Sequence, residues 1–196
     1  MKKYSALIGI IIFSIVCLLV VVFNYQSSDI TVSKYAVMNS FSLVSFCVLG
    51  CISAIFIFYG LVFYLPKKWG LGTIYKIIAS LFSASFFWMC AVPCISGMIL
   101  VDLHNVGSYA MLYLGLTLII FWLIRLWREY NVRLKIINGS ILLAMLTIFS
   151  LQIFQYDFLW HFILYIEMGV VVIIFTQIIL LIFDKPKDAS NDRTEG

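Results

Sequence analysis

The sequence predicts an all-α fold, a polytopic membrane bundle of six transmembrane helices with both termini in the cytoplasm. Composition is the first observation: 64% of the residues are hydrophobic and 11% are charged, against about 25% charged in soluble domains. Second, the apolar residues form long runs, and a helix needs about 20 of them to cross a bilayer. Third, 196 residues leave room for about six such runs and little else. We therefore expect the lipid bilayer to be the solvent of this chain.

The first apolar run, residues 4–23, follows Lys2 and Lys3 and looks at first like a signal peptide. Asn24-Tyr25-Gln26 offers no small-x-small cleavage pattern, and the run exceeds the roughly 7 to 15 apolar residues of a signal peptide. We expect it to be retained as the first span. The other spans are predicted at about 40–65, 75–100, 107–126, 136–154 and 158–183, within a single domain of residues 1–183. The polar segment 184–196 is expected to be a disordered cytoplasmic tail.

Basic residues are distributed unevenly between the two sides of the predicted bundle. Of the 13 Lys and Arg residues, only Lys34 falls on the side opposite to the termini. Because basic loops stay in the cytoplasm, we expect a multi-pass protein of the cell inner membrane with cytoplasmic termini. The net charge of +4 then reports topology and predicts no nucleic-acid partner. Asp102-Leu103-His104-Asn105 is expected to form a short loop on the far side.

Glu167 is the acidic residue that the sequence places deep inside a span. It lies about nine residues into the last run, so at ~1.5 Å per residue it is about 14 Å deep, near the middle of a ~30 Å hydrocarbon layer. No Lys or Arg lies at that depth, whereas Ser14, Tyr113 and Thr117 offer hydroxyl groups at a similar depth. Two interpretations stay open. The carboxyl group either holds helices together through hydrogen bonds, or it acts as a proton or cation relay or as a ligand-binding group in a cavity.

A second polar group, Asp102, His104, Asp157 and His161, is expected at the outer rim of the bundle. Two histidines and two carboxylates can bind a metal ion, but only Asp157 and His161 have the i, i+4 spacing that puts two ligands on one helical face. His161 and Glu167 are six residues apart, so they point about 120° apart around the helix. The alternative is a set of interface residues with no metal.

Four cysteines are expected to lie level with one another in two neighbouring spans. In an antiparallel hairpin, level residues have a constant sum of positions, and Cys47 with Cys94 and Cys51 with Cys90 both give 141. The four thiols then face one another and form disulfides or a site for copper(I) or zinc. The alternative is close packing of small residues, as in Gly50-x-x-x-Ala54.

The order of features resembles a known family. Ser28-Asp29 in an outer loop, the segment Leu103-His104-Asn105-Val106-Gly107-Ser108-Tyr109-Ala110 and a glutamate in the sixth span are similar to those of bacterial six-span membrane proteins of a domain of unknown function. These in turn resemble the damage-regulated autophagy modulator-like membrane protein superfamily. The resemblance implies a six-helix bundle, roles for Asp29, His104 and Glu167, and contact with lipids. The chain departs from the family pattern because no Gly follows Asp29.

Together these features predict a binding or regulatory membrane protein and do not predict an enzyme. Its expected site is an outward-facing polar cavity between the third, fourth and sixth spans, with His104 at the mouth and Glu167 at the floor. The ligand is expected to be a lipid head group or a small polar molecule, and the other partners a second copy or another membrane protein. One alternative is a proton- or cation-coupled transporter that uses Glu167; another is a thiol-based redox or metal-binding protein. The residues predicted to bind the ligand are His104, Glu167, Asp102, Asp29, His161 and Tyr113.

Overall fold

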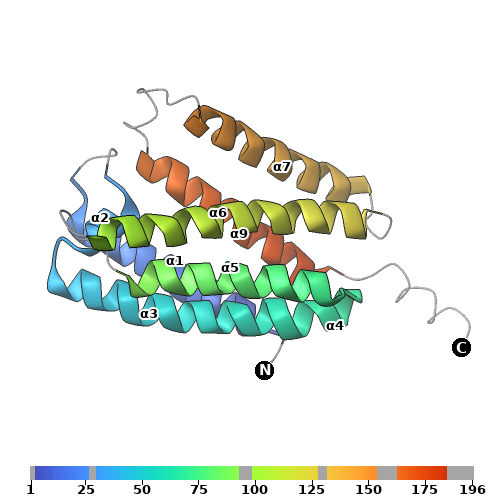
Figure 1. Cartoon of the computed structure of the whole chain (residues 1–196), viewed down its shortest axis with the longest axis horizontal. Coiled ribbons are helices and arrows are strands. Elements are labelled where there is room, and N and C mark those ends of the chain that lie inside the picture. The colour runs from blue at the N-terminus through green and yellow to red at the C-terminus, as the bar shows by residue number, and fades with distance from the viewer. Residues whose placement is uncertain (1–2, 27–29, 93–98, 128–131, 154–162, 185–196) are drawn as a thin grey trace, which may run out of the picture.

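The described part of the chain consists of helices joined by short connections (Figure 1). The structure is a computed structural model, and it describes residues 3–26, 30–92, 99–127, 132–153 and 163–184. The all-α prediction is confirmed. The α-helices are α1 (Ser5–Asn24), α2 (Val32–Ala36), α3 (Ser40–Tyr59), α4 (Leu65–Trp69), α5 (Thr73–Ala91), α6 (Ile99–Leu126), α7 (Val132–Ile153) and α9 (Ile163–Phe183).

Length and hydropathy make several of these helices candidates for membrane spans. Within the described residues, four helices are long and apolar enough to cross a bilayer: Ser5–Asn24, Ser40–Trp69, Thr73–Ala91 and Asp102–Arg125. Two shorter apolar stretches, Lys135–Ala144 and Met168–Phe183, lie in α7 and α9. The chain is therefore a helical multi-pass membrane protein by composition and helix length, and the count of six spans stays a prediction.

Two predicted boundaries were wrong. Helix α5 ends at Ala91, nine residues before the predicted end at 100, and α6 begins at Ile99, eight residues before the predicted start at 107. The expected loop Asp102-Leu103-His104-Asn105 therefore lies inside α6. Polar residues suggested a loop, but an acidic residue in the first turn of a helix favours helix formation because it complements the positive end of the helix dipole.

The helix predicted to end at residue 65 continues beyond it. Helix α3 passes through a π-helical segment, Gly60–Tyr64, into α4. Pro66 explains the interruption, because proline has no N–H to donate to the carbonyl group four residues earlier. The Leu65 N–H group instead donates to the Gly60 carbonyl, five residues back. Gly70 then ends α4 with a φ of 61°, a left-handed conformation that glycine adopts without strain.

Helices α1, α3 and α5 form a tightly packed layer, which we call the glycine-packed layer. A Cβ atom on Gly9 would lie 2.7 Å from the Ser53 carbonyl oxygen, and one on Gly60 would lie 2.3 Å from the Ala6 Cβ atom. The Ser53 hydroxyl group donates to the Gly9 carbonyl at 2.7 Å. Small residues thus let the backbones of α1 and α3 approach closely, as in other membrane helix pairs.

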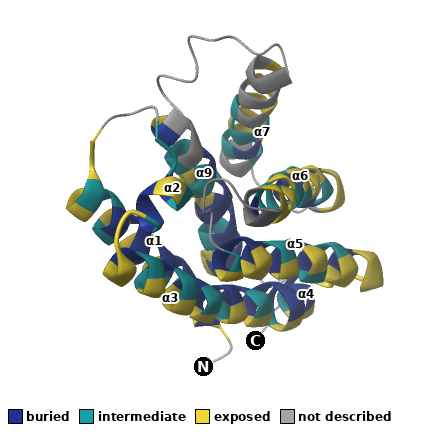
Figure 2. Cartoon of the chain, turned by 60° about the vertical axis from the view of Figure 1, so that its left-hand side comes forward, coloured by how far each residue is buried: buried dark blue, intermediate teal, exposed yellow. Residues whose placement is uncertain are grey.

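Helix α9 lies in the middle of the bundle, next to α1, α6 and α7 (Figure 2). It runs in the same direction as α6, since both lead from the end that carries Asp102 to the end that carries Arg125. We call the latter the basic end of the bundle and the former the opposite end. The described basic residues at the basic end are Lys3, Lys67, Lys68, Lys76, Arg125 and Lys135.

Lys68 joins α4 to the end of α9. Its ammonium group donates to the carbonyl oxygens of Leu181 and Ile182, each at 2.8 Å, and also to that of Asp184. The Trp69 indole N–H donates to the Leu181 carbonyl at 3.0 Å. The last carbonyl groups of a helix have no partner within the helix and carry partial negative charge, so a lysine is well suited to bind them.

Candidate functional site

His104 lies in the contact between α5 and α6. Its side chain is 2% exposed, and its Nδ1 atom is 2.7 Å from the Val92 carbonyl oxygen. A carbonyl group only accepts, so Nδ1 carries the proton and donates it. The Trp88 indole N–H donates to the Leu103 carbonyl at 2.9 Å, one residue away. His104 thus ties the end of α5 to α6.

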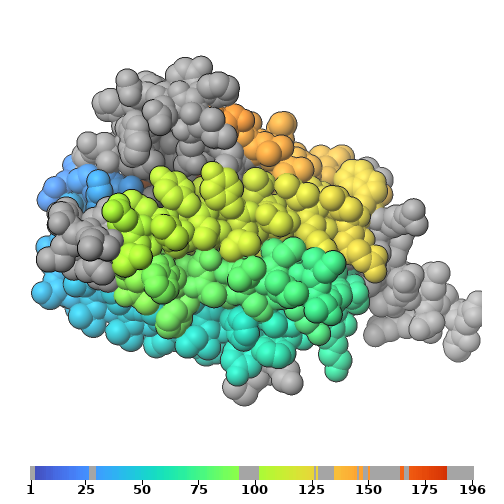
Figure 3. Space-filling model, viewed as in Figure 1, coloured from blue at the N-terminus to red at the C-terminus, as the bar shows by residue number. Residues whose placement is uncertain are grey.

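Asp102 and Tyr113, two other residues of the predicted site, are exposed on one face of α6. They are 11 residues apart, which is about three helical turns. Tyr109 and Thr117 share this face and are also exposed, with 58% of Tyr109 and 55% of Tyr113 accessible. We call Asp102, Tyr109, Tyr113 and Thr117 the α6 polar row. Figure 3 shows the surface on which α6 extends across the molecule above α5 and α3.

The α6 polar row lies on a helix whose other face is packed. Leu118, Ile119 and Trp122 are almost fully buried, and a Cβ atom on Gly115 would lie 2.9 Å from Ile174 Cδ1 of α9. The Thr117 hydroxyl group donates to the Tyr113 carbonyl at 2.8 Å, within the helix. The exposed tyrosines and Asp102 therefore point away from the contacts of α6 with α5 and α9.

Glu167 belongs to α9, but the structure describes its backbone only. The predicted site residues Asp29 and His161 lie outside the described residues, as does Asp157 of the predicted rim. Near Glu167 along the chain, the Tyr165 side chain hydrogen-bonds to Tyr25, and this bond raises the pKa of Tyr25. The structure therefore brings the beginning of α9 next to the end of α1. The prediction that Asp102, His104, Asp157 and His161 lie together stays a prediction, because two of them lie outside the described residues.

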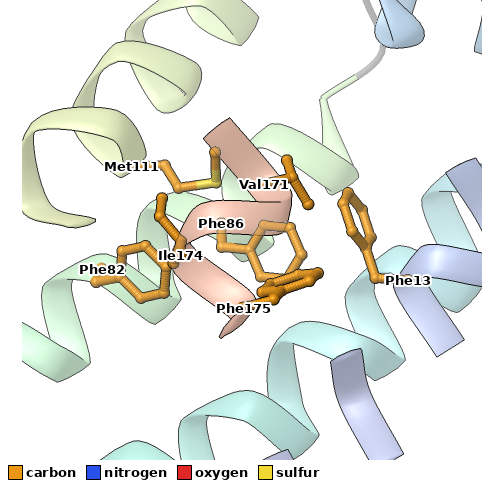
Figure 4. A pocket seen from close by; sticks show the side chains of 7 residues that line it. All are labelled: Phe13, Phe82, Phe86, Met111, Val171, Ile174 and Phe175. Atoms are coloured by element: carbon orange, nitrogen blue, oxygen red, sulfur yellow. The ribbon is translucent and has the colours of Figure 1, made fainter. Parts of the chain in front are cut away.

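An apolar pocket lies between α5, α6 and α9, with α1 completing it (Figure 4). On α9 its lining begins at Val171, about one turn after Glu167, and the polar cavity predicted between His104 and Glu167 stays a prediction. The hollow is about the size of one water molecule. Its lining has no hydrogen-bonding side chain, and apolar cavities of this kind stay dry. This pocket therefore does not serve a polar ligand. It is lined by Phe13, Phe82, Phe86, Met111, Val171, Ile174 and Phe175.

The structure brings cysteines from three helices together. A Cβ atom on Gly50 of α3 would lie 2.8 Å from the Cys90 Sγ atom of α5, and Cys17, Cys47 and Cys51 are close enough to Cys90 to interact with it electrostatically. None of these four thiols forms a disulfide in the described part of the chain. Among the described residues, no group of three or more potential ligands is arranged to hold a metal ion. Cys94, the remaining member of the predicted set, lies outside the described residues.

Two buried polar residues were missed by sequence reasoning. Gln177 of α9 is 0% exposed and Trp122 of α6 is 1% exposed. Within the described part of the chain, neither the Gln177 amide nor the Trp122 indole N–H has a hydrogen-bond partner. Gln177 follows Thr176 in an otherwise apolar run, and because it carries no charge it gave no signal comparable to that of Glu167.

Fold and composition define the class: a helical, multi-pass membrane protein with polar residues on one exposed helix face and in its interior. Comparison with known proteins gives no narrower assignment. No protein-family model, no curated protein and no solved structure matches this chain.

Proposed function

We propose that this protein is a membrane-embedded binding protein that holds a lipid with an amine-bearing head group against the α6 polar row. The observation that carries this proposal is the exposure of Asp102, Tyr109 and Tyr113 on one face of an apolar helix. A polar side chain that faces acyl chains is costly unless it finds a partner. A lipid head group next to the helix supplies such a partner for Asp102 and Tyr109.

The position and chemistry of the row favour an amine head group. Asp102 lies near the start of α6, where a spanning helix meets the head-group region, and its carboxylate attracts an ammonium group. Side chains of a helix lean toward its N-terminus, so the rings of Tyr109 and Tyr113 lean toward Asp102. Their hydroxyl groups are then directed to donate to the phosphate or ester oxygens of the same lipid.

Glu167 supports the same region. Gly115 of α6 approaches Ile174 of α9, and the two helices run in the same direction, so Glu167, seven residues before Ile174, is level with Ser108. It therefore lies at the depth of the α6 polar row. We propose that its carboxyl group contributes to the polarity that attracts the head group.

Lipid retention measured by native mass spectrometry tests this function. Protein extracted gently from membranes is incubated with phosphatidylethanolamine or with phosphatidylglycerol. We expect phosphatidylethanolamine to be retained, and Asp102→Asn to weaken its binding about tenfold, which corresponds to about 1.4 kcal/mol. Tyr113→Phe and Glu167→Gln should weaken it less. Tyr59→Phe, at an exposed tyrosine of α3, is the control and should leave retention unchanged.

Two results would contradict the proposal. Equal retention of both lipids in all variants would show that binding does not depend on the row. Retention of a second copy of the chain in place of lipid, lost in Tyr113→Phe, would show that the row is a dimer interface.

The orientation in the membrane is part of the proposal. The basic end carries Lys3, Lys67, Lys68, Lys76, Arg125 and Lys135, and Lys34 lies at the opposite end. By the positive-inside rule, we propose that the basic end and both termini face the cytoplasm of a cell with an inner membrane, and that six helices span it. Reporter fusions at residues 70 and 196 should both be active in the cytoplasm. A periplasmic reporter signal at either position would overturn this topology.

A thiol site is the second candidate, favoured by the approach of Cys90 to the half-buried Cys47 and Cys51. The same mass spectra, recorded with and without reductant, test it. A mass lower by two hydrogen atoms that reductant restores, or a bound copper(I) or zinc ion, would favour this function. Alkylation of every thiol without reductant would rule it out.

A further inference from the structure

The Gln177 amide lies in the core of the bundle without a hydrogen-bond partner among the described residues. Its amide offers two N–H donors and one carbonyl acceptor, and both its Nε2 and Oε1 atoms are buried without a partner among the described residues. Buried polar groups almost always have a partner in protein or ordered water. The indole N–H groups of Trp69 and Trp88 donate to backbone carbonyl groups, whereas that of Trp122 has no partner among the described residues.

Gln177 and Trp122 lie close in depth. Because Ile174 is level with Gly115, Gln177 is level with Leu118, and Trp122 follows one turn later, about 6 Å farther toward the basic end. The Tyr75 ring of α5 lies beside the Trp122 ring, with 6.1 Å between centroids. This level lies nearer to the basic end of the bundle than to the opposite end, since α6 ends at Leu126 and α9 at Phe183.

Asn138 of α7 adds a polar side chain at the same level. It is 1% exposed, and Lys135, three residues earlier, lies over the Trp127 ring at 5.0 Å. Helices α6 and α7 run antiparallel, and the contact places Lys135 beside Trp127. Asn138 is therefore level with a residue of α6 that lies within one turn of Trp122. Helices α5, α6, α7 and α9 thus each contribute one buried polar side chain: Tyr75, Trp122, Asn138 and Gln177.

The charges around these residues favour a neutral ligand. The four side chains are neutral, and of the described basic residues beside them Lys68 binds the carbonyl oxygens at the end of α9, Lys135 lies over the Trp127 ring, and Lys76 and Arg125 are exposed. The described carboxylates with resolved side chains, Asp102 and Asp184, lie at the two ends of the bundle. A small neutral molecule that both donates and accepts hydrogen bonds fits this set of groups.

We propose that Gln177 and Trp122 hold a buried cluster of water molecules that enters from the basic end. A water molecule accepts from the Trp122 N–H and the Gln177 amide and donates to the Gln177 carbonyl, which satisfies each unpartnered atom. The cluster reaches into the bundle from the side opposite to the lipid site on α6, so it does not depend on the lipid-binding proposal.

X-ray hydroxyl-radical labelling of the intact protein in detergent tests this proposal, because a bound water molecule generates radicals beside its neighbour. Trp122 should be oxidised although it is buried, and its labelling should persist when a scavenger removes radicals from bulk water. In Gln177→Leu, labelling of Trp122 should fall at least about threefold while that of the equally buried Trp69 is unchanged. Ile178→Leu, at a fully buried neighbour, is the matched control.

Labelling of Trp122 that the scavenger abolishes in the wild-type chain would overturn the proposal, and this measurement needs no variant. The midpoint of unfolding gives a second decision. If water satisfies the amide, Gln177→Leu lowers the midpoint. If the amide is buried without a partner, the substitution removes a cost and raises the midpoint, which would also overturn the proposal.

Discussion

The two halves of this bundle achieve burial in different ways. In the glycine-packed layer of α1, α3 and α5, glycines bring backbone and side-chain atoms into direct contact, and the polar Ser53 is satisfied by a backbone carbonyl group. In the half formed by α6, α7 and α9, which we call the polar half, Trp122, Asn138 and Gln177 are buried. Close packing of small residues defines the first half, which also holds the thiols of the second candidate site, whereas the second half buries amide and indole groups. Candidate sites for function therefore differ in chemistry between the two halves.

The largest expected change in the free energy of unfolding comes from a glycine-to-alanine substitution, which we compare between the two halves. Gly60→Ala should lower the free energy of unfolding by about 3 kcal/mol, the upper part of the range for overpacked cores, because the new Cβ atom would lie 2.3 Å from Ala6 Cβ and 2.9 Å from the Ala6 backbone nitrogen. Titration with SDS in mixed micelles, followed by far-ultraviolet circular dichroism, measures the change.

Gly139→Ala in α7 is the matched control for this prediction. No described atom lies within 4 Å of its Cβ position, and alanine favours a helix over glycine by up to about 1 kcal/mol. This variant should be as stable as the wild type or more so. Equal losses at Gly60 and Gly139 would remove the distinction between the two halves.

A smaller effect is expected where α4 meets α9 and so joins the halves. Lys68→Met keeps much of the apolar stem but removes the ammonium group that binds the carbonyl oxygens of Leu181 and Ile182. Hydrogen bonds to charged groups contribute about 1.5 to 3 kcal/mol, and we expect a loss of about 2 kcal/mol in the same titration. Lys67→Met, at an exposed neighbour, should change stability little. If the two variants behave alike, the join does not depend on Lys68.

The smallest effect sharpens the claim that shape governs the glycine-packed layer. Ser53→Ala removes the 2.7 Å bond to the Gly9 carbonyl, and hydrogen bonds between membrane helices contribute about 0.6 kcal/mol. Ser14→Ala, at an exposed position of α1, is the control. A loss in Ser53→Ala as large as that in Gly60→Ala would mean that polar contacts hold this layer as strongly as its close packing does.

The helical class and most helix positions followed from the sequence because long apolar runs determine them. The cysteine spacing placed Cys51 level with Cys90, and in the structure Gly50, next to Cys51, approaches the Cys90 sulfur atom. Level residues in any antiparallel helix pair have a constant sum of positions. The relative heights of the cysteines could therefore be predicted from the position of the connection between the two helices.

Other features could not be predicted because they depend on contacts between distant segments. Lys68 binds carbonyl groups that lie 113 residues or more along the chain, and in the sequence it looked like an ordinary interface residue after Pro66. The polarity of Asp102 and His104 suggested a loop. Hydropathy gives no sign that the His104 ring is buried and donates to the Val92 carbonyl group. The roles predicted for Glu167, Asp29 and His161 stay predictions.

The π-helical segment Gly60–Tyr64 has a consequence for the length of the chain. Before it, the buried face of α3 includes Ser53, Ala54 and Ile57, and after it the buried residues of α4 are Leu65, Pro66 and Trp69. An uninterrupted α-helix would carry the first face on to position 68, because residues seven or eleven apart share a face. The segment thus acts as a one-residue insertion that turns the end of the helix by about 100° and directs Trp69 toward α9. A deletion of one residue between 60 and 64 would therefore restore a regular helix and leave Lys68 and Trp69 in their present places, whereas an insertion there would turn both by a further ~100°, so this stretch tolerates the loss of a residue more readily than a gain.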